Sequence, residues 1–135
     1  MNRDQYDAYL AFFNGRNYDG VVSHFNLDAI VAFADVRLQG HDAIRRFYGF
    51  FHDYVSEQIR VDRFLGDDES VMLEATVRIE AKKDLTQEIL LQEGYPSLVP
   101  LSKGQVVEIP QFIHYHLKGG KFSTALCAMA MFGIE

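Results

Sequence analysis

The stretch that decides the fold is Gln105–Leu117 (QVVEIPQFIHYHL), followed almost at once by Lys121–Phe132 (KFSTALCAMAMF). Both runs are rich in apolar, β-branched and aromatic residues, which is typical of β-strands. Only Lys118-Gly119-Gly120 separates them, and a Gly-Gly pair suits the positive-φ turns of tight hairpins. The sequence therefore predicts a long antiparallel hairpin as the floor of the fold.

Further strands are predicted upstream of this hairpin. Ser70–Glu80 alternates apolar and polar side chains strictly, which indicates a half-buried antiparallel strand. Glu57–Leu65 alternates in the same way. Ile30–Phe33 and Val36–Gln39 are two short strands, joined either by a tight turn or by a bend. These segments extend the hairpin into one sheet.

Prolines and glycines interrupt the strand pattern in two places. Leu85–Leu91 could extend a strand, but Gly94-Tyr95-Pro96-Ser97 and Pro100 favour a long excursion over 82–103. Such an excursion inside a compact domain is often a lid or a rim. Pro110 cannot donate to a sheet ladder, so we expect a bulge or bend at that position.

Three helices are predicted ahead of the long strands. In Arg3–Phe13, aromatic residues recur at helical spacing, and Asn14-Gly15 ends the helix. A short second helix begins after Asn17, and the third covers His41 to about Ser56 with a wide apolar stripe. Helices followed by antiparallel strands predict an α+β fold, in which one curved antiparallel or mixed sheet wraps around three N-terminal helices.

Composition favours a single globular domain over residues 1–135. The chain is 48% hydrophobic and carries a net charge of −6, so a nucleic-acid backbone or an anionic membrane is a disfavoured partner. No apolar run approaches the ~20 residues of a membrane span, and the charged N-terminus does not resemble a signal peptide. A single cysteine cannot form an internal disulfide. We therefore expect a cytoplasmic protein.

The order of elements, and above all Leu38–Tyr48 (LQGHDAIRRFY), resembles the SnoaL-like and nuclear transport factor 2-like superfamily, which includes ketosteroid isomerase and polyketide cyclases. The stretch Tyr95–Phe122 is similar to small SnoaL-like proteins. The resemblance implies a cone-shaped α+β barrel with an apolar pocket between helices and sheet, usually in a homodimer. Many members are cofactor-independent isomerases, dehydratases, cyclases or epoxide hydrolases, while others only bind or transport.

The resemblance to ketosteroid isomerase also implies positions for catalytic groups. The helix tyrosine of that family falls on Tyr9, whereas its base falls on Phe33 and its acid on Phe112. Phenylalanine cannot exchange a proton, so steroid-type enolisation by those residues is disfavoured. Asp35 is a candidate for a displaced base, the alternative being an ordinary turn aspartate.

His114 is the predicted proton carrier. Aligning the Gly-Gly turn with the family places the even-numbered side chains of that strand, among them His114 and His116, toward the pocket. A histidine in an apolar cavity suits general acid or base chemistry, although a structural hydrogen bond is the alternative. No third ligand has clear spacing, so no metal site or cofactor is predicted. His52 is expected to face solvent.

The predicted ligand is a hydrophobic small molecule, and a closed core without a cavity is the alternative. On the second arm of the hairpin, Cys127, Met129 and Met131 share one face. The residues expected to line the pocket are Phe12, Phe33, Tyr48, Phe51, Phe112, Cys127 and Met129. The leading functional hypothesis is a cofactor-independent lyase or isomerase for an oxygenated ring compound. The alternative is a non-catalytic ligand-binding or protein-interaction domain of the same fold.

Overall fold

The computed structural model describes residues 1–130, which form four helices and six strands. In chain order these are α1 (Arg3–Asn14), α2 (Tyr18–Val22), β1 (Phe25–Phe33), β2 (Val36–Gln39), α3 (His41–Tyr54), β3 (Val55–Gly66), β4 (Ser70–Ala81), α4 (Gln87–Glu93), β5 (Val106–Lys118) and β6 (Lys121–Met129). No helix of this described part is long and apolar enough to cross a membrane. Met131 and the end of the predicted strand lie outside the described residues.

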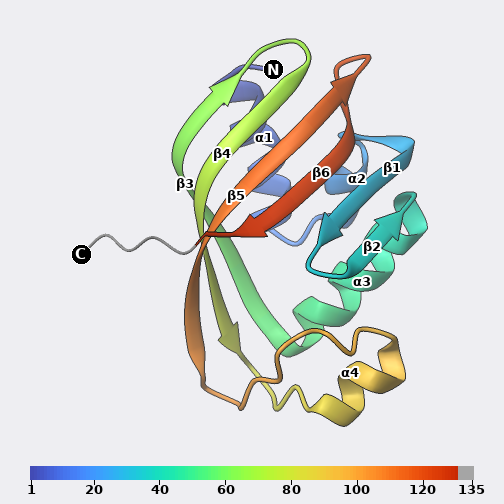
Figure 1. Ribbon diagram of the computed structural model, residues 1–135, viewed down its shortest axis with the longest axis vertical. Coiled ribbons are helices and arrows are strands. Elements are labelled where there is room, and N and C mark those ends of the chain that lie inside the picture. The colour runs from blue at the N-terminus through green and yellow to red at the C-terminus, as the bar shows by residue number, and fades with distance from the viewer. Residues whose placement is uncertain (131–135) are drawn as a thin grey trace.

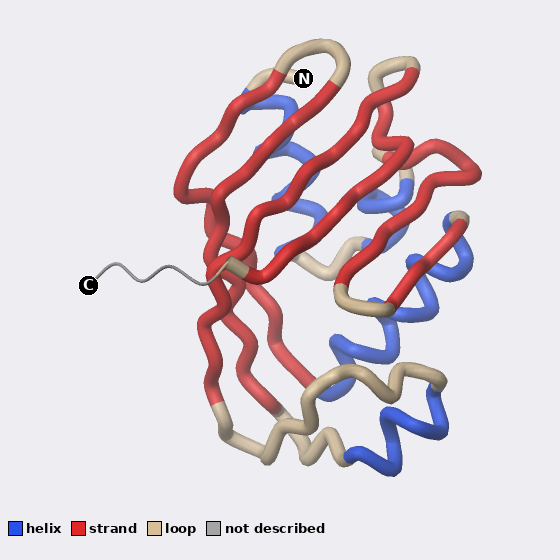
Figure 2. The backbone as a smooth tube through the Cα atoms, in the orientation of Figure 1, coloured by secondary structure: helices blue, strands red, loops and turns tan. Residues whose placement is uncertain are grey.

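One curved sheet holds all six strands in the order β2-β1-β6-β5-β4-β3 (Figure 1). Neighbouring strands are antiparallel except β1 and β6, which run parallel. The sheet curls around α1, α2 and α3 without closing, and the helices lie behind it in the view of Figure 2. The predicted α+β fold with a curved sheet around three N-terminal helices is therefore confirmed.

Side chains cap the beginnings of α1, α2 and α4, whereas α3 begins after Gly40 without a side-chain cap. Asn2 accepts a hydrogen bond from the backbone N–H of Gln5, and the Gln5 side chain accepts one from the backbone N–H of Asn2, which forms a capping box for α1. The Thr86 side chain accepts a hydrogen bond from the backbone N–H of Ile89 at the start of α4, and Gly94 ends that helix in the left-handed conformation, with φ of +91°.

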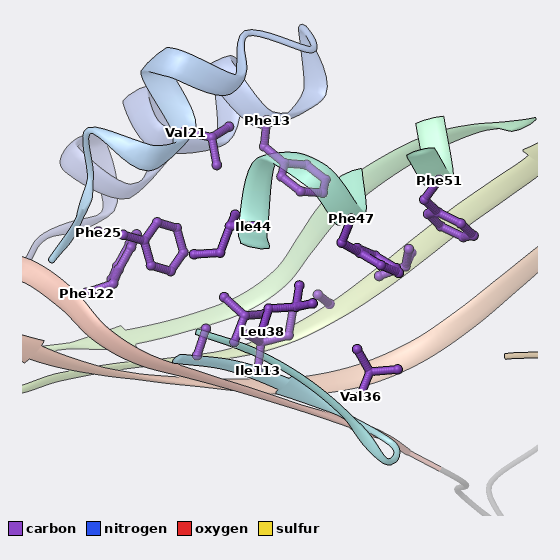
Figure 3. Close-up of a cluster of buried hydrophobic side chains, with 14 of the residues drawn as sticks. Phe13, Val21, Phe25, Val36, Leu38, Ile44, Phe47, Phe51, Ile113 and Phe122 are labelled. Carbon is purple, nitrogen blue, oxygen red and sulfur yellow. The ribbon is translucent and has the colours of Figure 1, made fainter. Parts of the chain in front are cut away.

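The core lies between the helices and the concave face of the sheet. Figure 3 shows Ile44 of α3 beside Phe25, with Phe47 farther along the same helix and Leu38 and Ile113 on the strands. All five side chains are buried. The remaining labelled side chains in that view are Phe13, Val21, Val36, Phe51 and Phe122. Burial of so many large apolar groups is the main favourable contribution to folding.

The predicted orientation of β5 is wrong. Ile113 and Tyr115 are 2% and 3% exposed and face the helices, whereas Phe112 is 39% exposed and lies on the outer face together with His114. The odd-numbered side chains of this strand are the more apolar set, so the hydrophobic effect turns them inward. The apolar pattern of the strand itself decides which face is buried, and aligning its turn with the turn of the family predicted the wrong face.

Segment 82–105 covers one end of the cone instead of extending a strand. Within it, α4 buries Leu90, and an isolated bridge pairs Leu85 with Leu101. The Tyr95 ring packs at 4.9 Å from the ring of Phe47. In Figure 1 this segment lies below the ends of α3, β4 and β5. The expectation of an excursion is confirmed, and the alternative of a strand over Leu85–Leu91 is wrong.

Pro110 causes no bulge, because the β4–β5 register runs past it without a shift. The Pro110 carbonyl oxygen accepts a hydrogen bond from the Ala130 backbone N–H at 2.8 Å. In a strand the nitrogen and the carbonyl of one residue point to the same side, so the Pro110 nitrogen also faces β6 and not β4. β6 ends beside it, at Met129. The missing donor therefore costs no ladder hydrogen bond to β4.

Candidate active site

The most unusual feature inside the cone is a histidine paired with a carboxylate. His52 Nε2 lies 2.8 Å from Glu57 Oε1, and the two side chains are only 2% and 13% exposed. α3 ends at Tyr54 and β3 begins at Val55 without an intervening loop. This abrupt change from helix to strand places the two side chains, five residues apart, opposite each other.

Aromatic rings hold the His52 imidazole in place. The ring of Tyr48 stacks on it at 5.4 Å, Tyr18 stacks at 5.8 Å, and Phe13 meets it edge-on at 5.6 Å. The Tyr18 hydroxyl also lies 2.8 Å from His52 Nδ1. Both ring nitrogens therefore have a hydrogen-bond partner, and the expectation that His52 faces solvent is wrong.

A second group of polar atoms is formed by tyrosines of α1 and β5. The hydroxyls of Tyr6 and Tyr115 lie 2.8 Å apart, and the Tyr9 ring lies 6.2 Å from that of Tyr115. Burial raises the pKa of all three phenols. At neutral pH these hydroxyls stay protonated and are available as hydrogen-bond donors.

The Glu57 carboxylate adds to the effect of burial on the pKa of two of the groups inside the fold. Burial raises the pKa of Tyr48, and the Glu57 carboxylate is the next contributor. Burial raises the pKa of the Cys127 thiol to about 12, with Glu57 again contributing. Cys127 lies on β6 between Ile113 and Phe33 in the strand register. The interior thus combines one carboxylate, one imidazole, neutral phenols and a neutral thiol with apolar walls.

Some of the residues predicted for the site do lie in this interior. Tyr9 is buried in the tyrosine group, and Phe33 packs against Phe47 at 5.2 Å. Phe51 stacks on Phe47 at 5.5 Å, and Tyr48 packs on His52. Of these aromatic side chains, Tyr48 and Phe51 lie against the His52 ring, and the others belong to the same core.

Other predicted residues lie elsewhere. Phe12 packs outside the core, against the backbone of α2 at Gly20. Asp35 is exposed in the turn between β1 and β2, next to Ala34 with φ of +50°. Met129, at the end of β6, is 69% exposed. These positions contradict a place in the interior for all three residues. α1 buries its other face, the turn projects beyond the sheet, and Met129 lies where β6 ends.

His114 does not face the interior either. Its neighbours in the register are Met72 and Leu126, and its ring lies 4.6 Å from that of His116. Phe112 shares this outer face. Within residues 1–130, no group of three or more His, Cys, Asp or Glu side chains is arranged as metal ligands would be. The interior role predicted for His114 is therefore not compatible with its position.

Sequence reasoning missed the His52–Glu57 pair. Glu57 was expected to begin a strand, and His52 was expected to lie on the polar side of a helix. Each residue does lie in the predicted type of element, but neither pattern describes how the two elements meet. The one available signal was the absence of turn residues between the predicted helix and the predicted strand. Without a turn, the last helical side chains and the first strand side chains must lie close together.

Two surface hollows flank the fold. One, of about 490 Å³, lies beside Met1, Gln5 and His24. The other, of about 410 Å³, lies beside Leu65, Met72 and Phe112, toward the outer face of the sheet. Neither is lined by Glu57 or His52. The pocket between helices and sheet stays a prediction.

The curved sheet, its strand order and the helices packed against it define the nuclear transport factor 2-like fold. The chain belongs to the SnoaL-like domain family, whose family model matches residues 6–124. The resemblance seen in the sequence is therefore confirmed. A comparison with curated proteins found no match.

Solved structures with the same fold have low sequence identity to this chain. A candidate polyketide cyclase from Xanthomonas campestris pv. campestris is 20% identical, with a TM-score of 0.73 over 90% of this chain and 84% of that one. A protein of unknown function from Burkholderia pseudomallei is 14% identical, with a TM-score of 0.72 over 96% of this chain and 92% of that one. An epoxide hydrolase from M. tuberculosis is 12% identical, with a TM-score of 0.68 over 92% of this chain and 78% of that one. At these identities the likeness establishes the fold.

The raised pKa of Cys127 predicts an unreactive thiol. With a pKa of about 12 in place of the ordinary 9.0, the thiolate fraction at pH 8 is lower by three orders of magnitude. We expect a disulfide reagent to modify the native protein at least ~100-fold more slowly than the urea-unfolded protein, since only thiolate reacts. Equal rates in the two states would contradict the shielding of the thiol in the partly buried position of Cys127.

Proposed function

We propose that the protein is a cofactor-independent lyase or isomerase that moves a proton on a hydrophobic, oxygenated ring compound bound inside the cone. The observation that carries this proposal is the His52–Glu57 pair at 2.8 Å in an interior otherwise formed by aromatic and aliphatic side chains. A histidine and a carboxylate that are hydrogen-bonded to each other and largely shielded from water are groups suited to general acid–base chemistry. The family includes both catalytic and non-catalytic members, so the pair is the specific argument for catalysis.

In this proposal Glu57 is the general base. Its carboxylate removes a proton from a carbon next to a carbonyl or hydroxyl group of the ligand, and His52 holds the carboxylate in position. A positioned general base typically contributes about 10²–10⁴ in rate. The low polarity of the surrounding side chains strengthens its interaction with the reacting proton.

The tyrosine hydroxyls are the proposed partners of the ligand oxygen. Tyr9 and Tyr115 stay protonated because burial raises their pKa, so each is a neutral donor. As negative charge develops on the ligand oxygen, such a donor stabilises it, and losing one preorganised donor typically lowers the rate by about 10²–10³. No metal or cofactor is needed for this chemistry.

Segment 82–105 supports a closed reaction chamber. Tyr95 packs on Phe47 and Phe50, so α4 and its flanking loops lie against the helix that carries His52. Exclusion of water by such a segment favours proton transfer over side reactions. The names of the Xanthomonas and M. tuberculosis proteins, a candidate polyketide cyclase and an epoxide hydrolase, agree with oxygenated hydrophobic ligands in this fold.

The test is turnover of a panel of cyclic enones, steroids, terpene epoxides and aromatic polyketides. For any compound that reacts, Glu57→Gln should lower kcat/KM by about 100-fold or more, because the amide cannot accept the proton. Glu69→Gln, in the exposed turn before β4, and His114→Ala are the controls, and both should retain activity.

Full activity of a folded Glu57→Gln variant would contradict the assignment of the base. Loss of activity in His114→Ala alone would return the catalytic role to the outer face. A wild-type protein that binds compounds of the panel but converts none of them would support the ligand-binding alternative.

We also propose that two copies of the chain pair through the outer face of the sheet. This face exposes apolar side chains of four neighbouring strands, namely Leu65, Met72, Phe112 and Leu126. The Arg63–Glu74 ion pair, with an N–O distance of 3.2 Å, borders this face. In a two-fold symmetric contact, Arg63 of one copy can then face Glu74 of the other copy. Contiguous exposed apolar surface of this kind typically marks an interaction site.

Light scattering tests the dimer. Two copies of the 15.5 kDa chain have a mass of ~31 kDa, which we expect for the wild-type protein. Leu126→Glu should yield a monomer, because a charge would be buried in the contact. Leu27→Glu, at an exposed position of β1, is the matched control. A wild-type monomer at micromolar concentration would contradict this proposal.

A further inference from the structure

Tyr18 connects the buried His52–Glu57 pair to the surface of the helix layer. Its hydroxyl lies 2.8 Å from His52 Nδ1 and 3.4 Å from the carbonyl oxygen of Tyr48. Unlike His52, Tyr18 is only partly buried. The three side chains therefore form a continuous line of hydrogen-bonding groups from the interior to the outside.

We propose that Tyr18 and His52 form a proton path that links Glu57 to solvent. This inference rests on the proposed function only in taking Glu57 as the group that receives the ligand's proton. Tyr18 and His52 are positioning and relay residues in this path, since Glu57 is the one member of the path that contacts the ligand. The path allows Glu57 to exchange its proton while segment 82–105 stays in place.

The geometry permits a balanced transfer. Before the proton transfer, Glu57 is protonated and donates to His52 Nε2, while the Nδ1–H group of His52 donates to the Tyr18 oxygen. During it, the Glu57 O–H bond breaks and an Nε2–H bond forms. The Nδ1–H bond breaks and a Tyr18 O–H bond forms, and the original Tyr18 proton passes to water. Afterwards Glu57 is ionised, and the imidazole is neutral in its other tautomer.

The surroundings hold this line of groups rigidly. Tyr48 and Tyr18 stack on the imidazole, so the ring cannot turn away from its two partners. The charged groups that face the pair are Arg16, whose guanidinium donates to the Glu57 carbonyl oxygen, and Lys82, whose ammonium donates to the His52 carbonyl oxygen at 2.7 Å. Both bind backbone oxygens, which leaves the side-chain line from Glu57 to Tyr18 continuous.

A purely structural hydrogen bond is the competing explanation, and hydrogen exchange separates the two. In the ligand-free protein labelled with ¹⁵N-histidine, the exchange of the His52 ring N–H with water is measured by NMR. The resonance missing from His52→Gln assigns the signal among the five histidines. Tyr18→Phe keeps the stacked ring and removes only the hydroxyl. Tyr48→Phe, which stacks on the same imidazole, is the matched control.

The proton path predicts that Tyr18→Phe slows this exchange by about tenfold or more, whereas Tyr48→Phe changes it by less than about twofold. An unchanged or faster exchange in Tyr18→Phe would overturn the proposal, because loosened packing alone speeds exchange. The measurement needs no substrate. A slowed exchange together with an active Glu57→Gln enzyme would refute the proposed function and leave the path intact.

Discussion

The direct passage from α3 to β3 is the constraint on which the interior depends. Several contacts hold this junction. The Asn14 side chain, at the end of α1, donates to the Ile59 carbonyl oxygen at 3.1 Å and accepts from the Ile59 N–H at 3.0 Å. Lys82, just beyond β4, binds the carbonyl oxygen of His52. Helix layer and sheet edge are therefore tied together at the residues that carry the polar pair.

That rigidity allows polar groups to exist in an apolar core. An unpaired buried polar group costs about 1–3 kcal/mol, so such groups persist only with partners. Among residues 1–130, no buried side-chain nitrogen or oxygen lacks a hydrogen-bond partner. The tyrosines remain neutral for the same physical reason, because burial disfavours the phenolate. The interior is thus a preorganised set of donors and acceptors.

Much of the fold could be predicted from the sequence, because periodicity and turn residues are local signals. The alternation in Ser70–Glu80 and the Gly119-Gly120 turn both lead to the observed strands. The length of β1 was underestimated, since its first half, with Asn26 and Asp28, has the composition of a turn. Helix α4 was missed because its seven residues are too few for a clear helical period.

The candidate site was less accessible to sequence reasoning. Tyr9 was placed correctly in the interior because it lies on the apolar stripe of α1. The face of β5 was misjudged because an alignment of turns was preferred to the apolar pattern of Ile113 and Tyr115. The His52–Glu57 pair depends on how two elements meet, and neither helical nor strand periodicity describes that contact.

A double-mutant cycle on this pair tests the central claim most directly. Urea unfolding of His52→Leu, Glu57→Leu and the double variant would measure how strongly the two side chains depend on each other. We expect each single change to lower the free energy of unfolding by about 2 kcal/mol or more, because the remaining partner is buried without its hydrogen bond. The double variant should lose at least ~1 kcal/mol less than the sum. Additive effects within about 0.5 kcal/mol would contradict a coupled pair at the centre of the site.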